Sequence, residues 1–204
     1  GVHFEAGPNT FLQVNRGVCR KLYERVARYG VESGAAVAID AYSGGGILTA
    51  LLARQIGKAY GIEAVAEASA CADALVEPNK LEGRMFNICG RVEDKLPEVL
   101  NGLIAKETFL VVDPPRKGVD RGTLRALLES GIPRIAMISC NPATMARDVG
   151  ILTGALVEEG NELKKNPNYT AGGKDGYYSI VSVQPFDMFP QTKWVETLVC
   201  LERK

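Results

Sequence analysis

The sequence predicts an α/β protein with a mostly parallel sheet, flanked by helices and carrying an antiparallel strand pair at one edge. Short apolar runs typical of buried strands alternate with helical segments over most of the chain, which is the pattern of βαβ units. A glycine turn follows the first of these strands. The last two expected strands, 178–183 and 195–201, have no helix between them, as in an antiparallel pair.

The elements are expected in the following order. Val18, Leu22 and Val26 recur at helical spacing and predict a first helix over 17–29. Apolar runs predict strands at 36–40, 59–63, 85–89, 109–112 and 135–138, and the intervening segments predict helices at 47–55, 64–79 (rich in alanine), 92–101, 122–129 and 144–152. The polar stretch 159–176 predicts a mobile loop. There is no internal repeat and no second core, so we expect a single domain over 1–204.

Composition excludes several classes of protein. Lys plus Arg equals Asp plus Glu, at 24 each, so any nucleic-acid binding must come from a local basic patch or from another part of the protein. Five scattered cysteines without a C-x-x-C pair argue against a disulfide framework and against a metal site. The only histidine is His3, which disfavours a Ser-His or Cys-His mechanism. No signal peptide or membrane-spanning run is present, and we expect the reducing cytoplasm.

The glycine turn indicates a nucleoside-binding site. The turn Ser43–Gly46 follows the 36–40 strand, and Glu63 ends the next strand, where a carboxylate accepts hydrogen bonds from ribose hydroxyls. A dinucleotide is disfavoured because Thr49 stands at the third glycine position and Asp40 lies close by. S-adenosylmethionine carries an ammonium and a sulfonium and no phosphate, so it suits these acids better.

Two other predicted strands end in rigid polar turns. Cys140 follows the 135–138 strand, and Asp113 follows the 109–112 strand in the run Asp-Pro-Pro-Arg. Ligands bind at the carboxyl ends of strands in open α/β sheets. We therefore expect a thiol and a carboxylate at the same rim. Cys140 also precedes a predicted helix N-terminus, which favours the thiolate form.

These runs carry a clear family resemblance. Five motifs stand in family order: Phe-Leu-Gln-Val-Asn at 11–15, Asp-Ala-Tyr-Ser-Gly-Gly-Gly at 40–46, Asp-Pro-Pro-Arg-Lys-Gly at 113–118, Ser-Cys-Asn-Pro-Ala-Thr at 139–144 and Asp-Met-Phe-Pro-Gln-Thr at 187–192. The chain resembles the S-adenosylmethionine-dependent RNA uracil-C5 methyltransferases, which make 5-methyluridine in tRNA or ribosomal RNA. The resemblance implies a Rossmann-like class I methyltransferase fold, S-adenosylmethionine as cofactor and RNA as partner.

The resemblance also implies residue roles. Cys140 is the expected nucleophile toward uracil C6, Glu196 the base, and Asp113 a catalytic group beside uracil and cofactor. The expected cofactor-binding residues are Gln13, Tyr42, Gly44, Gly46, Glu63 and Asp113. Phe11 is expected to pack beside Gln13, and Arg116 and Arg147 are candidate phosphate contacts. No metal is expected, and we expect a monomer.

The chain departs from the family pattern in several places. Lys193-Trp194 precedes Val195-Glu196 where relatives usually have a proline-histidine or similar pair. The loop 153–175 is longer than expected and is a candidate RNA-facing insertion. The family's N-terminal RNA-binding β-barrel and small central domain are absent from this chain, so residues 1–16 are expected to enter from a preceding region.

Three alternatives stay open at this point. An amino-group nucleic-acid methyltransferase would need an aromatic residue after the prolines, where Arg116 stands. A non-catalytic module that binds S-adenosylmethionine would have no use for both Cys140 and Glu196. A dinucleotide-dependent oxidoreductase is weakened by Thr49.

Overall fold

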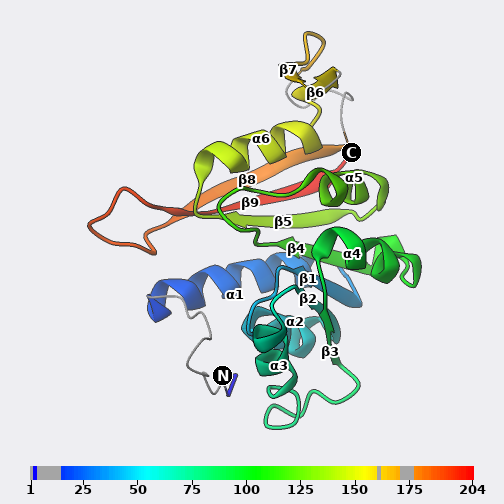
Figure 1. The fold of residues 1–204 in the computed structure, drawn as a ribbon, viewed down its shortest axis with the longest axis vertical. Coiled ribbons are helices and arrows are strands. Elements are labelled where there is room, and N and C mark those ends of the chain that lie inside the picture. The colour runs from blue at the N-terminus through cyan, green and yellow to red at the C-terminus, as the bar shows by residue number, and fades with distance from the viewer. Residues whose placement is uncertain (1, 4–14, 160–161, 171–176) are drawn as a thin grey trace.

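The protein is described by a computed structural model that covers residues 2–3, 15–159, 162–170 and 177–204. Its centre is a seven-stranded sheet in the order β3-β2-β1-β4-β5-β9-β8 (Figure 1). The first five strands are parallel: β1 (Val37–Ala41), β2 (Lys58–Glu63), β3 (Met85–Cys89), β4 (Thr108–Val112) and β5 (Arg134–Ser139). The predicted mostly parallel α/β sheet is confirmed.

Helices cover both faces of this sheet, because the central strands are apolar on both sides. One buried cluster joins alternate strand residues to α1 (Arg16–Glu32), α2 (Ile47–Ile56) and α3 (Ala66–Asp73). The other joins the remaining strand residues to α4 (Val92–Asn101), α5 (Arg121–Glu129) and α6 (Pro142–Leu152). A short 3₁₀ turn, Ala105–Glu107, leads into β4. The fold therefore has three layers, and the parallel sheet is buried between two helical layers.

The predicted antiparallel pair closes one edge of the sheet. Strand β9 (Glu196–Arg203) lies between β5 and β8 (Tyr178–Phe186) and is antiparallel to both. Pro185 lies in β8, where an edge strand tolerates the missing N–H donor. The turn that joins β8 to β9 extends beyond the sheet (Figure 1).

Two predicted elements differ from the structure. The alanine-rich helix expected over 64–79 ends at Asp73 and continues as turns, since Pro78 cannot donate a backbone hydrogen bond and disfavours a helical residue before it. The polar segment expected as a loop contains a hairpin of β6 (Leu156–Glu159) and β7 (Glu162–Lys165). Helix α6 leads from the end of β5 to this hairpin, which stands apart from the β8–β9 turn (Figure 1).

Candidate active site

The site lies between β1 and β4, where the chain stops adding strands on one side of the sheet and starts adding them on the other. The chain runs from β1 to β2 and β3 on one side and continues from β4 to β5 on the other, so the crevice opens above the ends of β1 and β4. The Asp113 N–H donates to the Ala41 carbonyl at 3.2 Å and joins the two strand ends. A cavity of about 1610 Å³ opens there, lined by α1, by turns that follow the parallel strands, and by Glu196 at the start of β9. This exceeds the volume of about 300–1,000 Å³ usual for one small ligand.

Glu63 lies against the glycine turn. One of its carboxylate oxygens accepts from the Gly44 N–H and the other from the Val65 N–H, both at 2.8 Å. Gly44 and Glu63 both line the cavity. The two hydrogen bonds fix the carboxylate at the end of β2 and leave further acceptor capacity on each oxygen.

The two predicted cofactor-binding glycines have different surroundings. Gly44 has a φ of +54°, lines the cavity and has nothing within 4 Å of the position that a Cβ would occupy. Gly46 has a φ of +77°, is buried, and would place a Cβ 2.6 Å from the Cβ of Ala72 and 2.9 Å from Met85. Gly46 is not among the described residues that line the cavity. Close packing of α2 against α3 therefore accounts for glycine at position 46.

We expect Gly46→Ala to destabilise the fold far more than Gly44→Ala. Both changes impose a left-handed backbone on alanine, at about 1–2 kcal/mol. Only Gly46→Ala also forces overpacking against Ala72, at about 1–3 kcal/mol more. Urea denaturation of the two variants measures the difference. Equal losses of unfolding free energy would contradict this account of position 46.

Tyr42 stands in a strained conformation at the end of β1. Its φ is +68°, which is uncommon for a residue with a side chain and is typical of functional sites. Its hydroxyl donates to the Asp120 carboxylate at 3.1 Å, and Asp120 caps α5 by accepting from the Thr123 N–H at 2.8 Å. Burial raises the pKa of the Tyr42 hydroxyl, so the ring is held neutral along one wall of the cavity.

Cys140 lies between β5 and α6 and lines the cavity. Asn141 is the N-cap of α6 and accepts from the Ala143 N–H at 3.1 Å, while the buried Ser139 hydroxyl accepts from the Asn141 N–H at 3.0 Å. Cys71, Cys89 and Cys200 are not among the described cavity-lining residues. The turn thus presents the partly exposed thiol of the 139–144 motif to the cavity.

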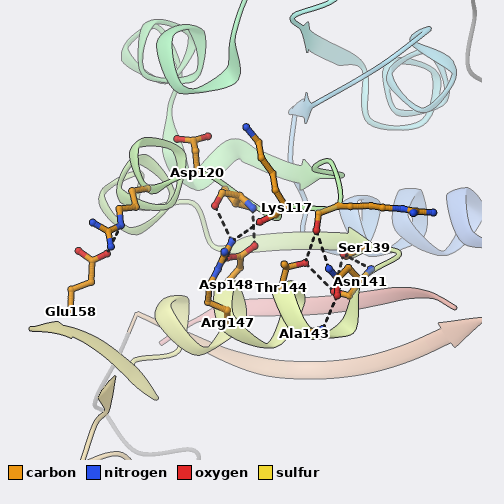
Figure 2. Close-up of polar contacts among 12 residues, drawn as sticks. Lys117, Asp120, Ser139, Asn141, Ala143, Thr144, Arg147, Asp148 and Glu158 are labelled. Atoms are coloured by element: carbon orange, nitrogen blue, oxygen red, sulfur yellow. Dashed lines mark hydrogen bonds and ion pairs between the residues drawn. The ribbon is translucent and has the colours of Figure 1, made fainter. Parts of the chain in front are cut away.

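Helix α6 holds the neighbouring Asp-Pro-Pro-Arg turn in place. The Arg116 carbonyl accepts from Asn141 Nδ2 at 3.0 Å and from Thr144 Oγ1 at 3.4 Å. Arg147 donates to the Lys117 and Val119 carbonyls at 3.2 Å and pairs with Asp148 (Figure 2). Arg147, a predicted phosphate contact, is thus engaged in positioning this turn.

Strand register brings Glu196 to Cys140. Ser139 pairs with Thr197 in the antiparallel ladder of β5 and β9, so the turn that follows β5 lies next to the start of β9. Glu196 is only 3% exposed, yet it lines the same cavity as Cys140. The structure therefore brings together the predicted nucleophile and the predicted base from distant parts of the sequence.

Two neighbouring acids share this region. Burial, followed by the nearby Asp113 charge, raises the pKa of Glu196 to about 8. Burial raises the pKa of Asp113 to about 7. Each carboxyl group can therefore be neutral or ionised near neutral pH, which suits groups that exchange protons or donate a hydrogen bond to a ligand.

Helix α1 contributes residues that the motifs do not reveal. Cys19 and Tyr23 are one helical turn apart and both line the cavity. Burial raises the pKa of Tyr23 well above its ordinary value, and the charges of Asp113 and Asp40 raise it further. The (i, i+4) spacing of two polar groups on the apolar face of α1 is the available signal.

The remaining predicted residues fall into two groups. Asp40 lies beneath the glycine turn, 1% exposed, and accepts from Thr49 Oγ1 at 2.6 Å, so Thr49 replaces the third glycine with an internal hydrogen bond. Gln13 and Phe11 lie outside the described residues.

Within the described ranges, no helix has the length and apolarity to cross a membrane, and no cluster of His, Cys, Asp or Glu suits a metal ion.

The chain is similar in sequence to proteins described as RNA methyltransferases. Residues 95–158 match the family model of tRNA (uracil-5-)-methyltransferase. An uncharacterized RNA methyltransferase of Clostridium acetobutylicum is 36% identical over 200 residues, which are 98% of this chain and 38% of that protein. A relative in Enterococcus faecalis is 34% identical over 201 residues, 98% of this chain and 39% of the relative. The chain thus spans about two fifths of the length of these relatives.

Solved structures confirm the predicted Rossmann-like class I methyltransferase fold. The Pyrococcus abyssi tRNA (uracil-54, C5)-methyltransferase, in complex with S-adenosyl-L-homocysteine, superposes with a TM-score of 0.70 at 24% identity, over 97% of this chain and 41% of its own. An O-methyltransferase of Bacillus cereus in complex with the same molecule has a TM-score of 0.63 at 14% identity, over 97% and 84% of the two chains. The family model and the curated relatives confirm the resemblance that the motifs indicate.

Proposed function

Because the chain is a relative of the RNA uracil-C5 methyltransferases, we propose that it transfers a methyl group from S-adenosylmethionine to C5 of a uridine in RNA. The observation that supports this proposal is that Cys140, after β5, and the buried Glu196, at the start of the neighbouring strand β9, line one cavity. The substrate is tRNA or ribosomal RNA, and the protein acts as a cytoplasmic monomer. Its target uridine must be single-stranded or flipped out of a duplex to reach a thiol inside the cavity.

Cys140 begins the reaction by covalent catalysis. Uracil C5 is too weakly nucleophilic to accept a methyl group unaided. The Cys140 thiolate adds to C6, a C–S bond forms, and the electron pair of the C5–C6 double bond makes C5 enolate-like.

Glu196 completes the reaction as the base. After methylation C5 carries both the new methyl group and its original hydrogen. The Glu196 carboxylate takes that hydrogen as a proton, the C5–C6 double bond re-forms, and the Cys140 thiolate leaves C6. A carboxylate whose pKa is raised to about 8 is a stronger base than an ordinary glutamate, which suits the removal of a carbon-bound proton.

Asp113 holds the uracil edge. It is half-buried at the end of β4, and its pKa of about 7 lets it donate a hydrogen bond to a carbonyl of the pyrimidine or accept one from its N3–H. Its backbone contact with Ala41 ties this group to the strand that leads into the glycine turn. Asp113 therefore orients the base between cofactor and nucleophile.

The residues at the glycine turn fit S-adenosylmethionine better than a dinucleotide. The Gly44 N–H, which a pyrophosphate would need, already donates to Glu63, and a carboxylate at this place would repel a phosphate. Tyr42, Gly44 and Glu63 would hold the adenosine part, with Asp113 beside the methionine part, and Gln13 remains a proposed contact. When bound, this cofactor supplies an electrophilic methyl group on its sulfonium sulfur.

Product analysis tests the proposed function. The protein is incubated with S-adenosylmethionine and either tRNA or ribosomal RNA that lacks 5-methyluridine, and the digested nucleosides are identified by mass spectrometry. We expect 5-methyluridine as the new nucleoside. Methylation of an exocyclic amino group in its place would support the amino-methyltransferase alternative and overturn the proposal.

A further inference from the structure

An exposed tryptophan stands on the turn between β8 and β9, against Arg116, which lines the cavity. Trp194 is 37% exposed and lies two residues before Glu196. The turn around it is firmly built: the Thr192 N–H and hydroxyl both donate to the Phe189 carbonyl, at 3.2 and 2.7 Å, and the Trp194 N–H donates to Thr192 Oγ1 at 3.1 Å. Met188, at the start of the turn, is fully buried. Such a ring is held in place without being buried.

Positive charge surrounds this ring. The Arg116 guanidinium lies 4.6 Å from the ring centroid and the Lys193 ammonium 5.2 Å from it. Among the described residues, neither cation has a carboxylate partner within ion-pair distance. The chain as a whole has no net charge, so these two cations form a local concentration of positive charge around an aromatic face.

Arg116 links the Trp194 ring to both proposed catalytic turns. The Arg116 backbone carbonyl is bound by Asn141, the residue after Cys140, while its side chain reaches Trp194, two residues before Glu196. Arg116 also lines the cavity. The Arg116 side chain therefore links the Trp194 ring to the cavity.

We propose that Trp194 is a stacking platform for a nucleobase that flanks the target uridine in single-stranded RNA. Lys193 and Arg116 bind the backbone phosphates of that RNA. This inference rests on the proposed function for its location. Aromatic rings stack on any nucleobase while cations follow the backbone, and this combination is characteristic of single-strand binding. The Arg116 guanidinium on the ring preorganises the platform and strengthens the stack through its cation–π contact.

Intrinsic fluorescence tests the platform, because Trp194 is the only tryptophan of the 204-residue chain. The probe is a short single-stranded RNA with one uridine among purines, together with a series in which a single abasic nucleotide replaces each neighbour of the uridine in turn. We expect saturable quenching by the intact RNA and loss of quenching when the abasic nucleotide directly flanks the uridine. RNA that binds with unchanged fluorescence, as judged by filter binding, would overturn the proposal.

Variants separate stacking from a structural role. Trp194→Ala is expected to weaken RNA binding about tenfold, the size typical of one stacked base, and Trp194→Phe to restore most of it. Lys193→Ala should instead lower the salt dependence of binding. The matched control is Tyr177→Ala. Tyr177 directly precedes β8, at the end of that strand away from the Trp194 turn, and its half-exposed ring lies 5.4 Å from the Arg203 guanidinium. Equal losses from Tyr177→Ala and Trp194→Ala would contradict a specific platform.

The two proposals fail separately. Quenching of the unchanged protein by RNA and tenfold weaker RNA binding by Trp194→Ala, without any 5-methyluridine formed by the unchanged protein, would leave the platform standing and remove the proposed function. Formation of 5-methyluridine with Trp194→Ala as active and as tightly bound as the unchanged protein would remove the platform alone. In that case the Arg116–Trp194 contact only holds the turn in place.

Discussion

Replacing Cys140 by alanine is expected to abolish methyl transfer to RNA and to leave the affinity for S-adenosylmethionine unchanged. The reason is chemical, because C5 is activated only when the Cys140 thiolate adds to C6, and burial raises the pKa of the other thiol in the cavity, Cys19. The loss of a nucleophile typically lowers turnover by about 10³-fold to 10⁶-fold. The side chain is small and half-exposed at the end of β5, so the fold tolerates the change. Incorporation of a labelled methyl group measures turnover, and calorimetric titration measures cofactor affinity.

The matched control for this prediction is Cys89→Ala. Cys89 is an exposed free thiol at the end of β3, on the edge strand farthest from β8. This control variant keeps full activity if the effect at position 140 is specific. A Cys140→Ala variant that methylates RNA at a rate close to the unchanged protein would show that the reaction needs no covalent adduct.

Glu196→Gln is expected to trap the reaction after methylation. Glutamine keeps the shape and hydrogen-bonding capacity of the side chain but cannot accept the C5 proton, so the methylated RNA stays bonded to Cys140. Mass spectrometry of the denatured protein should show RNA attached together with the methyl group. The control is Glu202→Gln on the same strand, whose carboxylate is exposed and pairs with Arg134 at 3.2 Å. Normal product release by Glu196→Gln would remove Glu196 from the role of base.

The pH dependence of product release gives a second readout for Glu196. A base works only when ionised, and burial together with the Asp113 charge raises the pKa of Glu196 to about 8. Release should therefore be slow below that pH and should rise as the pH increases through it. An exposed glutamate would already be ionised above its usual pKa of 4.5, so a release rate that stays flat through pH 8 would contradict a buried base.

The sequence predicts the parallel core well because the signal is local. Runs such as 109–112 are apolar at every position, and a strand buried on both faces needs no partner to be recognised. The hairpin of β6 and β7 has no such signal, because its strands are short and charged, with side chains that are largely exposed. The sequence predicts a helix that continues past the observed end of α3 at Asp73. Alanine favours a helix throughout 64–79, and this local preference hides the effect of Pro78.

The residues of the candidate site also differ in whether a local sequence signal predicts their position. Residues fixed by the end of one strand, such as Cys140 and Glu63, can be placed in the cavity from their own neighbourhood in the sequence. Gly46 has the same predicted role as Gly44, because only the packed structure shows Ala72 against it. The contribution of α1 depends on how that helix lies across the strand ends, and the burial of Glu196 depends on register between distant strands. Neither is encoded in a local pattern.

The central claim is that Cys140 forms a covalent bond with uracil C6, and RNA containing 5-fluorouridine tests it most directly. Fluorine at C5 cannot leave as a proton does, so the complex should stall after methyl transfer with RNA still attached. Incubation of the protein, S-adenosylmethionine and this RNA should give a denaturant-stable protein–RNA band that is absent with Cys140→Ala. A protein that binds S-adenosylmethionine and methylates unmodified RNA, yet forms no such band, would contradict the mechanism.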